Sequence, residues 1–493
     1  MKPLIRALAL ASCATSLAGC MMVGPDFQRP DAVAPAHWNL AAQAHDSPRS
    51  LVTSDPVETR WWRAFHDARL VTLIERAAAS NLDVQAATER LAQARAIRGV
   101  TDAAALPSLN GSASYQHARS SRRGLLDVSG LNGETDYNLW QPGFDASWEL
   151  DLWGRVRRLK EAARANAQAS EEMRRDVLVS VFAELARNYV QLRGVQAGQA
   201  ILRDNLDIAR HSEALTQIRF KDGVATRLEV AEATAQVRTI EAQLPLFEAQ
   251  RARRVNALGY LLGEPPGALD ALLAAAEPIP VTPPVVPAGL PSELAERRPD
   301  IREAEARLHA ATADIGVARG SFYPRITLSA NVALQAMHSG DLGEWSARMF
   351  GIGPALSVPI FDGGRLKGQL ALRTAQQREA MLAFRRTVLA AWHEIDDAMT
   401  EYAARQHHGA RLAEAIAQDR VALEQAHRQY VAGATDFLNV LTVQQALLKD
   451  QQARVTAATD EALALIGLFK ALGGGWETAF PVAEAGGARA DAR

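Results

Sequence analysis

The chain of 493 residues lacks several features that mark common protein classes. It has only 2 cysteines, Cys13 and Cys20, both near the amino end, which excludes a framework of disulfides. The formal net charge of -2 excludes the broad positive field that binds nucleic acid. Beyond residue 20 there is no run of about 18 apolar residues, so no transmembrane helix is expected there.

Motifs for catalysis are absent as well. The sequence contains no P-loop, no nucleophile elbow and no zinc-ligand spacing. His393 and Asp397 stand one helical turn apart, but no further ligands follow at a suitable spacing, which favours a packed or solvated helix face over a metal site. We therefore expect no enzyme activity, no cofactor and no metal.

The amino end has the form of an export signal. Lys2 and Arg6 precede an apolar stretch, and residues 17–20 then read Leu-Ala-Gly-Cys, the pattern of a bacterial lipobox. An ordinary signal peptide with an incidental cysteine is the alternative. Cys20 would be the only cysteine of the mature chain and has no internal disulfide partner, which favours lipid attachment. Two or three acyl chains would anchor the protein stably in a membrane.

The rest of the chain is written twice. Arg90, Leu91 and Gly99 match Arg307, Leu308 and Gly316 at an offset of 217 positions. Further along, the offset falls to 210 and stays constant, as in the matches of Gly154 with Gly364 and of Leu262 with Leu472. Two registers of this length indicate an internal duplication. The difference of 217 − 210 = 7 residues is expected in a loop, because loops tolerate changes of length.

Four stretches alternate apolar and polar residues with a period of two, which predicts half-buried strands. Their apolar members are Leu109, Ala113 and Tyr115, then Phe144, Ala146 and Trp148, then Ile326, Leu328 and Ala330, and finally Leu356, Val358 and Ile360. These stretches predict two β-hairpins, at about 108–152 and 325–361, with strands near the ~10 residues that cross a bilayer. Four strands cannot close a barrel, so several chains must each donate four.

A long helical hairpin is expected after each β-hairpin. Residues 155–222 and 365–432 contain no proline, and each run could span about 100 Å as a helix. Apolar side chains such as Leu178, Leu185 and Leu192 recur every seven residues, which predicts coiled-coil-like packing. Gly194 within the first run and Gly409 within the second indicate a local loosening of the helices.

Each long helix is predicted to end at a glycine turn. Gly223 and Gly433 suit the left-handed position after a helix. Thr226, and Asp436 after Thr435, are suitable amino-terminal caps for the helices that return. We also expect a helix at about 67–105, in front of the first β-hairpin and ended by Pro107.

The patterns divide the chain into six segments. They are a lipoprotein signal peptide (1–19), a lipid-anchored tether (20–60), the first repeat (61–263), a proline-rich linker (264–297), the second repeat (298–473) and a flexible carboxy-terminal tail (474–493). The expected fold is therefore an α+β membrane protein, in which a duplicated β-hairpin is combined with long α-helical hairpins.

The whole mature chain resembles the outer-membrane factor family, the TolC-like efflux ducts, and in particular its lipoprotein branch. The matching features are the lipobox, Gly-Pro-Asp-Phe at 24–27, the Trp61–Trp62 pair, the two glycine turns, Phe-Asp-Gly-Gly-Arg at 361–365 and the duplication. The resemblance implies a homotrimer with a 12-strand outer-membrane β-barrel and a 12-helix periplasmic α-barrel.

The resemblance also implies a function and partners. The duct would carry drugs or toxic small organic compounds, and its turns at Gly223, Thr226, Gly433 and Thr435 would dock a periplasmic adaptor protein. An inner-membrane pump, of the resistance-nodulation-division (RND) type, would supply the energy. Two alternatives stay open at this point, namely an exit duct for type I protein secretion and a structural lipoprotein without a pore.

The resemblance also implies a gate at the periplasmic end of the duct. Family members commonly carry acidic residues at its second-copy positions, but here Asn439 and Thr442 are neutral. Glu229 occupies the first-copy position that matches Asn439, and a ring of three such carboxylates would favour cations. The alternative is a capping box, because Thr226 and Glu229 have its spacing. Asp436 is likewise a cap or a gate residue, and Arg227 could pair with a neighbouring chain.

Overall fold

The computed structural model describes residues 22–31, 51–53, 55–121, 135–289, 293 and 297–477. The signal peptide predicted for 1–19, the lipid attachment predicted at Cys20 and most of the tail predicted for 474–493 lie outside these residues. The chain forms two compact units. The sheet unit comprises Met1–Pro30, Ala92–Ala169 and Ala304–Phe384, and the hairpin unit comprises Asp31–Leu91, Ser170–Glu303 and Arg385–Arg493.

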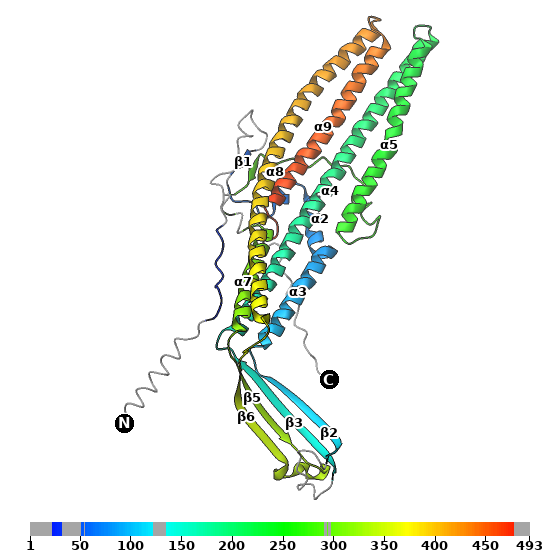
Figure 1. Cartoon of the computed structure of the whole chain (residues 1–493). Coiled ribbons are helices and arrows are strands. Elements are labelled where there is room, and N and C mark those ends of the chain that lie inside the picture. Colours follow the sequence, from blue (N-terminus) through cyan, green and yellow to red (C-terminus); the bar gives the residue numbers. More distant parts are fainter. Residues whose placement is uncertain are drawn as a thin grey trace. The chain divides into compact units, whose positions relative to one another are not determined.

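The sheet unit contains an antiparallel sheet with the strand order β2-β3-β5-β6 (Figure 1). Its strands are β2 (Ser108–Arg119), β3 (Asp136–Leu150), β5 (Arg325–Leu334) and β6 (Arg348–Ser357). The two hairpins, β2-β3 and β5-β6, join through β3 and β5, where Ser147 lies opposite Ser329. The 3-10 helices η5 (Ser339–Gly343) and η6 (Trp345–Ala347) lie between β5 and β6.

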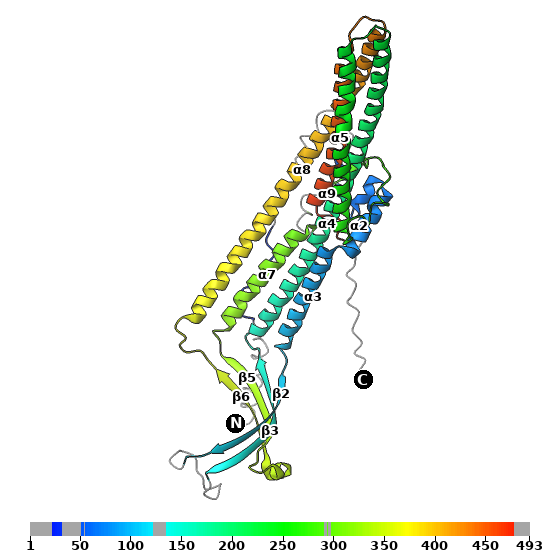
Figure 2. The same cartoon turned by 90° about the vertical axis from the view of Figure 1, so that its right-hand side faces the viewer.

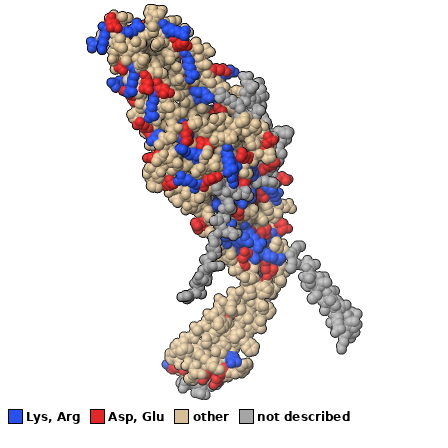
Figure 3. Space-filling model, turned by 180° about the vertical axis from the view of Figure 1, so that it is seen from behind, with Lys and Arg blue, Asp and Glu red and all other residues tan. Residues whose placement is uncertain are grey.

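One face of this sheet is apolar and exposed. The period of two places side chains such as Leu109, Phe144, Val332 and Ile352 on the same face, and each of them is at least 60% exposed. Asn110 on the opposite face donates to Asp145 Oδ2 over 3.1 Å. The strands form a surface with very few charged side chains in the lower part of Figure 3. An apolar surface of this extent marks an interaction site or a contact with lipid.

The long helices have the same lengths in both copies. Helices α4 (Arg155–Lys221) and α8 (Arg365–Val431) each have 67 residues, and α5 (Arg227–Leu261) and α9 (Phe437–Ala471) each have 35. Figure 1 shows α4 with α5 and α8 with α9 as two helical hairpins that lie side by side. Helix α4 passes through Gly194 and helix α8 through Gly409 without a break, so the loosening that we expected at these glycines is wrong.

The heptad positions form part of the core of the hairpin unit. Leu185, Leu192 and Tyr189 on α4 are fully buried, and their repeat mates Ile395 and Tyr402 on α8 are at most 1% exposed. Trp61 and Trp62, in the 3-10 helix η2 (Trp61–Phe65), are buried as well, and the Trp61 ring stacks on Phe469 with the ring centroids 5.3 Å apart. These positions are therefore buried, as coiled-coil-like packing requires.

The single helix predicted at about 67–105 is wrong. The structure has two helices, α2 (Ala68–Ser80) and α3 (Leu82–Ala103), separated by Asn81. The buried Asn81 side chain accepts from the backbone N–H of Asp83 and Val84, which caps α3, and it donates to the carbonyl of Leu261 over 2.8 Å. The Asn81 side chain therefore bonds both the first turn of α3 and a carbonyl far along the chain. These bonds stabilise the break between the two helices, although the sequence has no glycine or proline there.

The segments outside the two repeats also contribute regular structure. In the hairpin unit, β1 (Leu51–Thr53) of the tether pairs in parallel with β4 (Val285–Pro287) of the proline-rich linker. Helix α7 (Pro299–Gly320) follows the linker and begins the second repeat. In the described part of the chain, no helix is both long enough and apolar enough to cross a membrane.

Candidate functional site at the helical hairpin tips

The two tip turns have nearly the same backbone. Gly223 and Gly433 have φ angles of 75° and 74°, in the left-handed region that favours glycine. The N–H of Val224 bonds the carbonyl of Arg219 over 2.8 Å, and the N–H of Ala434 bonds that of Gln429 over 2.9 Å. Both turns therefore close their long helices in the same way, as the glycines predicted. Figures 1 and 2 show both tips at the same end of the hairpin unit.

The caps after the turns differ between the copies. Thr226 and Glu229 form a reciprocal capping box, in which the N–H of Thr226 donates to Glu229 Oε2 over 2.5 Å and the N–H of Glu229 donates to Thr226 Oγ1 over 3.3 Å. Asp436 Oδ1 accepts from the N–H of Asn439 over 3.1 Å, and the neutral Asn439 offers no reciprocal carboxylate. The capping alternative is thus confirmed for Glu229 and for Asp436.

Loss of either cap should loosen the start of its helix. We expect Thr226→Ala and Asp436→Ala each to cost about 1 kcal/mol in local stability, because a backbone donor loses its acceptor. Hydrogen exchange of the first turns of α5 and α9 measures this. Each substitution should speed exchange in its own helix only. Equal acceleration in both helices, or none in either, would contradict the assignment of the caps.

The tips also share a small core. Tyr430 on α8 packs against Phe437 on α9, with the ring centroids 5.4 Å apart, and Ala233 of α5 belongs to the same buried cluster. The guanidinium of Arg219 on α4 lies 4.4 Å from the centre of the Tyr430 ring, a distance at which a cation is attracted to an aromatic face. These contacts join the first helical hairpin to the second. Burial raises the pKa of the Tyr430 hydroxyl, the positive charge of Arg219 opposes this shift and Glu229 adds to it.

Sequence reasoning missed Arg219 and Tyr430. The only signal was an aromatic residue in the last turn of both long helices, Phe220 and Tyr430. The repeat mate of Arg219 is Gln429, so the duplication does not reveal the pair.

The other predicted gate residues lie on the surface of the tips. Arg227, Asn439 and Thr442 are exposed, and the Thr442 hydroxyl donates to the carbonyl of Leu438 in its own helix. Among the residues that the structure describes, Arg227 has no ion-pair partner within 4 Å. The structure therefore brings Glu229 together with Thr226 but not with Arg227.

Metal chemistry finds no support at these positions. Within the described ranges, no group of three or more His, Cys, Asp or Glu side chains is arranged to hold a metal ion. His393 and Asp397 are part of the continuous helix α8.

Comparison with known proteins gives consistent matches over nearly the whole chain. The sequence model described as "Outer membrane efflux protein" matches residues 73–264 and 290–474. The chain is 34% identical to the pyoverdine export outer membrane protein OpmQ of Pseudomonas aeruginosa, over 94% of this chain and 96% of that protein. It is 31% identical to the solvent efflux pump outer membrane protein SrpC of Pseudomonas putida, over 93% and 96%. Its fold is similar to that of the outer-membrane channel OprN, with a TM-score of 0.85, 32% identity and coverage of 92% and 99%.

Proposed function

The chain belongs to the outer membrane efflux protein family and is an outer-membrane component of efflux, and we propose that it forms the passive exit duct of a three-component pump. In this proposal three copies assemble into a homotrimer with a 12-strand β-barrel and a 12-helix α-barrel. An RND-type inner-membrane pump supplies the energy, and a periplasmic adaptor protein docks at the turns of Gly223, Thr226, Gly433 and Thr435.

The observation that carries the trimer is the open sheet. Among the described residues, the outer strands β2 and β6 each pair on one side only, and the apolar face of the sheet is exposed. Open strand edges are not tolerated in lipid, since unpaired backbone groups cost several kcal/mol each there. Three chains with four strands each supply enough strands to close a barrel, and the apolar face then contacts lipid. Because each chain contributes two helical hairpins, the same three chains supply the helices of the proposed α-barrel.

Two further features complete the proposal. Lipid attachment at Cys20 would add an anchor to the outer membrane beside the strands. The cargo is a class of small organic compounds, and the names of the relatives refer to different members, a pyoverdine for OpmQ and solvents for SrpC. Similar ducts with different cargoes support selection by the inner-membrane pump rather than by the duct.

Reconstitution into planar bilayers tests the duct. The purified protein should run as a trimer after cross-linking and give discrete conductance steps without an energy source. A structural lipoprotein without a pore would give no steps at any protein concentration. Absence of conductance from a verified trimer would therefore overturn the proposal.

We further propose that the tips gate this duct, with Glu229 and Asp436 as the charged residues at its mouth and with Arg227, Asn439 and Thr442 around them. The charge can be separated from the cap, because Gln and Asn retain capping ability without a negative charge. The double substitution Glu229→Gln with Asp436→Asn should lower the preference for cations, and charge reversal with Lys at both positions should lower it further.

Reversal potentials in a salt gradient measure this preference. Glu248→Lys is the matched control, since Glu248 is exposed on α5 and lies about six turns from the tip. If both double variants select ions as the unaltered channel does, the tip carboxylates do not line the gate.

A further inference from the structure

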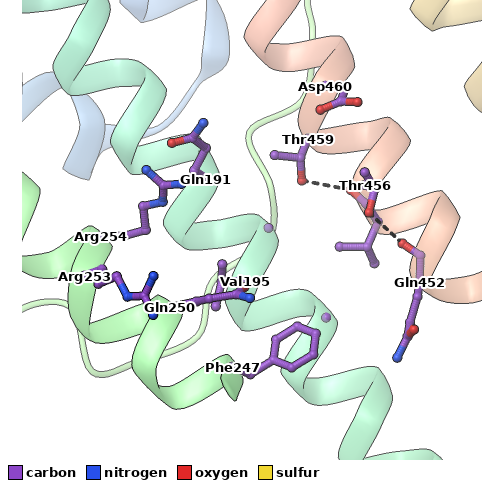
Figure 4. Close-up of a pocket in the computed structure, with 13 residues that line it drawn as sticks. Gln191, Val195, Phe247, Gln250, Arg253, Arg254, Gln452, Thr456, Thr459 and Asp460 are labelled. Carbon is purple, nitrogen blue, oxygen red and sulfur yellow. Dashed lines mark hydrogen bonds between the residues drawn. The ribbon is translucent and has the colours of Figure 1, made fainter. Parts of the chain in front are cut away.

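A groove of about 440 Å³ lies between α4, α5 and α9 in the hairpin unit. Helix α4 forms its floor, α5 one wall and α9 the other (Figure 4). At Gly194 and Gly198, one helical turn apart on α4, side chains of the two walls lie directly against the floor. A Cβ atom on Gly194 would lie 2.3 Å from Thr459 Oγ1, and one on Gly198 would lie 2.7 Å from Phe247 Cε1. Any larger residue would therefore collide with a wall.

The two glycines of the floor have no counterparts in the second copy. At the offset of 210, the mates of Gly194 and Gly198 are Ala404 and His408, which carry side chains. Glycine inside a helix costs roughly 0.5–1 kcal/mol relative to alanine. The two glycines thus destabilise α4, although the equivalent positions of α8 carry other residues.

The α5 wall is positively charged. Arg253 and Arg254 line it, whereas their repeat mates are Leu463 and Ala464. Arg253 is exposed and has no hydrogen-bond or ion-pair partner within the described parts of the chain. Arg254 makes a single long contact, 3.4 Å from Nη1 to Asn188 Oδ1. Both guanidinium groups therefore retain donors for an anion.

The α9 wall does not cancel this charge. Its one acidic lining residue, Asp460, accepts from Arg405 Nη1 on α8 over 2.8 Å. The buried Nε2 of Gln452 on the same wall has no acceptor within the described residues. A buried donor without an acceptor is rare in folded proteins, and an acceptor on a ligand would satisfy it.

We propose that this groove binds a flat organic anion, of which an aromatic carboxylate is the simplest form. The carboxylate accepts from Arg253 and Arg254, and Gln452 donates to a further acceptor. The ring lies in the groove and packs against the Phe247 side chain, which itself covers Gly198. The groove lies within one chain, so this site goes beyond the proposed duct and does not require that the duct conducts.

Direct binding tests the site. The full-length protein in lipid nanodiscs is titrated with 2-naphthoate and, in parallel, with the neutral 2-naphthamide, and saturation-transfer NMR reports each dissociation constant. For ligands of this size we expect a Kd for naphthoate on the order of 1 mM or tighter. Arg253→Gln with Arg254→Gln should weaken naphthoate binding about tenfold, because charge-assisted hydrogen bonds are lost, and should leave naphthamide unchanged.

Two variants complete the experiment. Gly198→Ala should weaken both probes, since the added methyl displaces the Phe247 ring against which they pack. Arg420→Gln, an exposed cation on α8 outside the groove, should change neither. The proposal is overturned if naphthoate shows no saturable binding, or if it binds the double arginine variant as tightly as the unaltered protein. Neither outcome depends on bilayer conductance, so failure of this site and failure of the duct are separately visible.

Discussion

Arg193→Met is expected to destabilise the hairpin unit by about 3–5 kcal/mol, more than any other single substitution proposed for this protein. The Arg193 side chain on α4 is fully buried. Its Nη2 lies 2.5 Å from Glu277 Oε2 of the linker and also donates to the Tyr189 hydroxyl over 3.0 Å. Its Nη1 donates to Gln196 Oε1 over 2.7 Å and to the carbonyl of Ala275 over 3.0 Å. Methionine replaces the volume but none of these bonds.

The network extends beyond the ion pair. The Tyr189 hydroxyl donates to Asp67 Oδ2 over 2.7 Å, and Asp67 caps α2. Arg193 therefore stabilises both the linker and the entry to the first repeat. Loss of the guanidinium leaves Gln196 Oε1 without its buried donor and weakens the bonding of the Ala275 carbonyl, while Glu277 keeps its ion pair with Arg69. This desolvation cost exceeds the net value of the bonds themselves.

Denaturant unfolding followed by circular dichroism measures the effect. Arg193→Lys should recover only part of the stability, because an ammonium group cannot reproduce the forked geometry. Adding Glu277→Gln to Arg193→Met should restore little of the loss, because Glu277 stays paired with Arg69 at 3.0 Å after Arg193 is replaced. The exposed control Arg420→Met should shift stability by less than about 0.5 kcal/mol. A loss at Arg193→Met as small as that of the control would show that the network is dispensable.

The symmetrical parts of the fold were predictable because both copies carry the same local signals. Proline-free runs between Gly154 and Gly223, and again between Gly364 and Gly433, correspond to helices of equal length. The glycine turns and the caps at Thr226 and Asp436 depend on residues within a few positions of each other. Short-range signals of this kind are legible in a single sequence.

The remaining features depend on contacts between distant segments. The break at Asn81 is stabilised by the carbonyl of Leu261, and the tip pair joins Arg219 to Tyr430. The residues around each of these side chains do not indicate which distant residue it contacts. The groove at Gly198 could not be predicted for the same reason. A glycine in a helix indicates the close approach of another side chain only once the facing helix is placed. The sequence could not show whether Glu229 and Asp436 are helix caps or gate residues, because a carboxylate at these positions can serve either role.

The Asp176 carboxyl on α4 is expected to make the stability of the hairpin unit depend on pH. Burial is the main cause that raises its pKa, from 3.8 to about 6, and the charges of Asp300 and Glu303 add to this shift. Arg298 and Lys470 oppose it without cancelling it. The neutral form of Asp176 is thus the one that the folded state prefers.

The sign of the effect follows from this raised pKa. The folded-state pKa lies above the unfolded value, so the contribution of Asp176 is fully present below pH 3.8 and is lost as the pH rises through about 6. At pH 7.5 the ionised carboxylate should cost about 2–3 kcal/mol. At pH 5 the cost should be about half of this, because most folded molecules then keep the proton.

Asp176→Asn should therefore stabilise the protein most at neutral pH, because asparagine keeps the shape of the neutral acid. The gain over the unaltered protein should be about 2–3 kcal/mol at pH 7.5 and should shrink steadily toward pH 4. Denaturant unfolding at pH 4, 5, 6 and 7.5 measures it. The control Asp207→Asn removes a carboxylate that is 79% exposed on the same helix, and it should show neither the gain nor the trend. A gain at Asp176→Asn that does not vary with pH would trace the stabilisation to packing instead of to the buried charge.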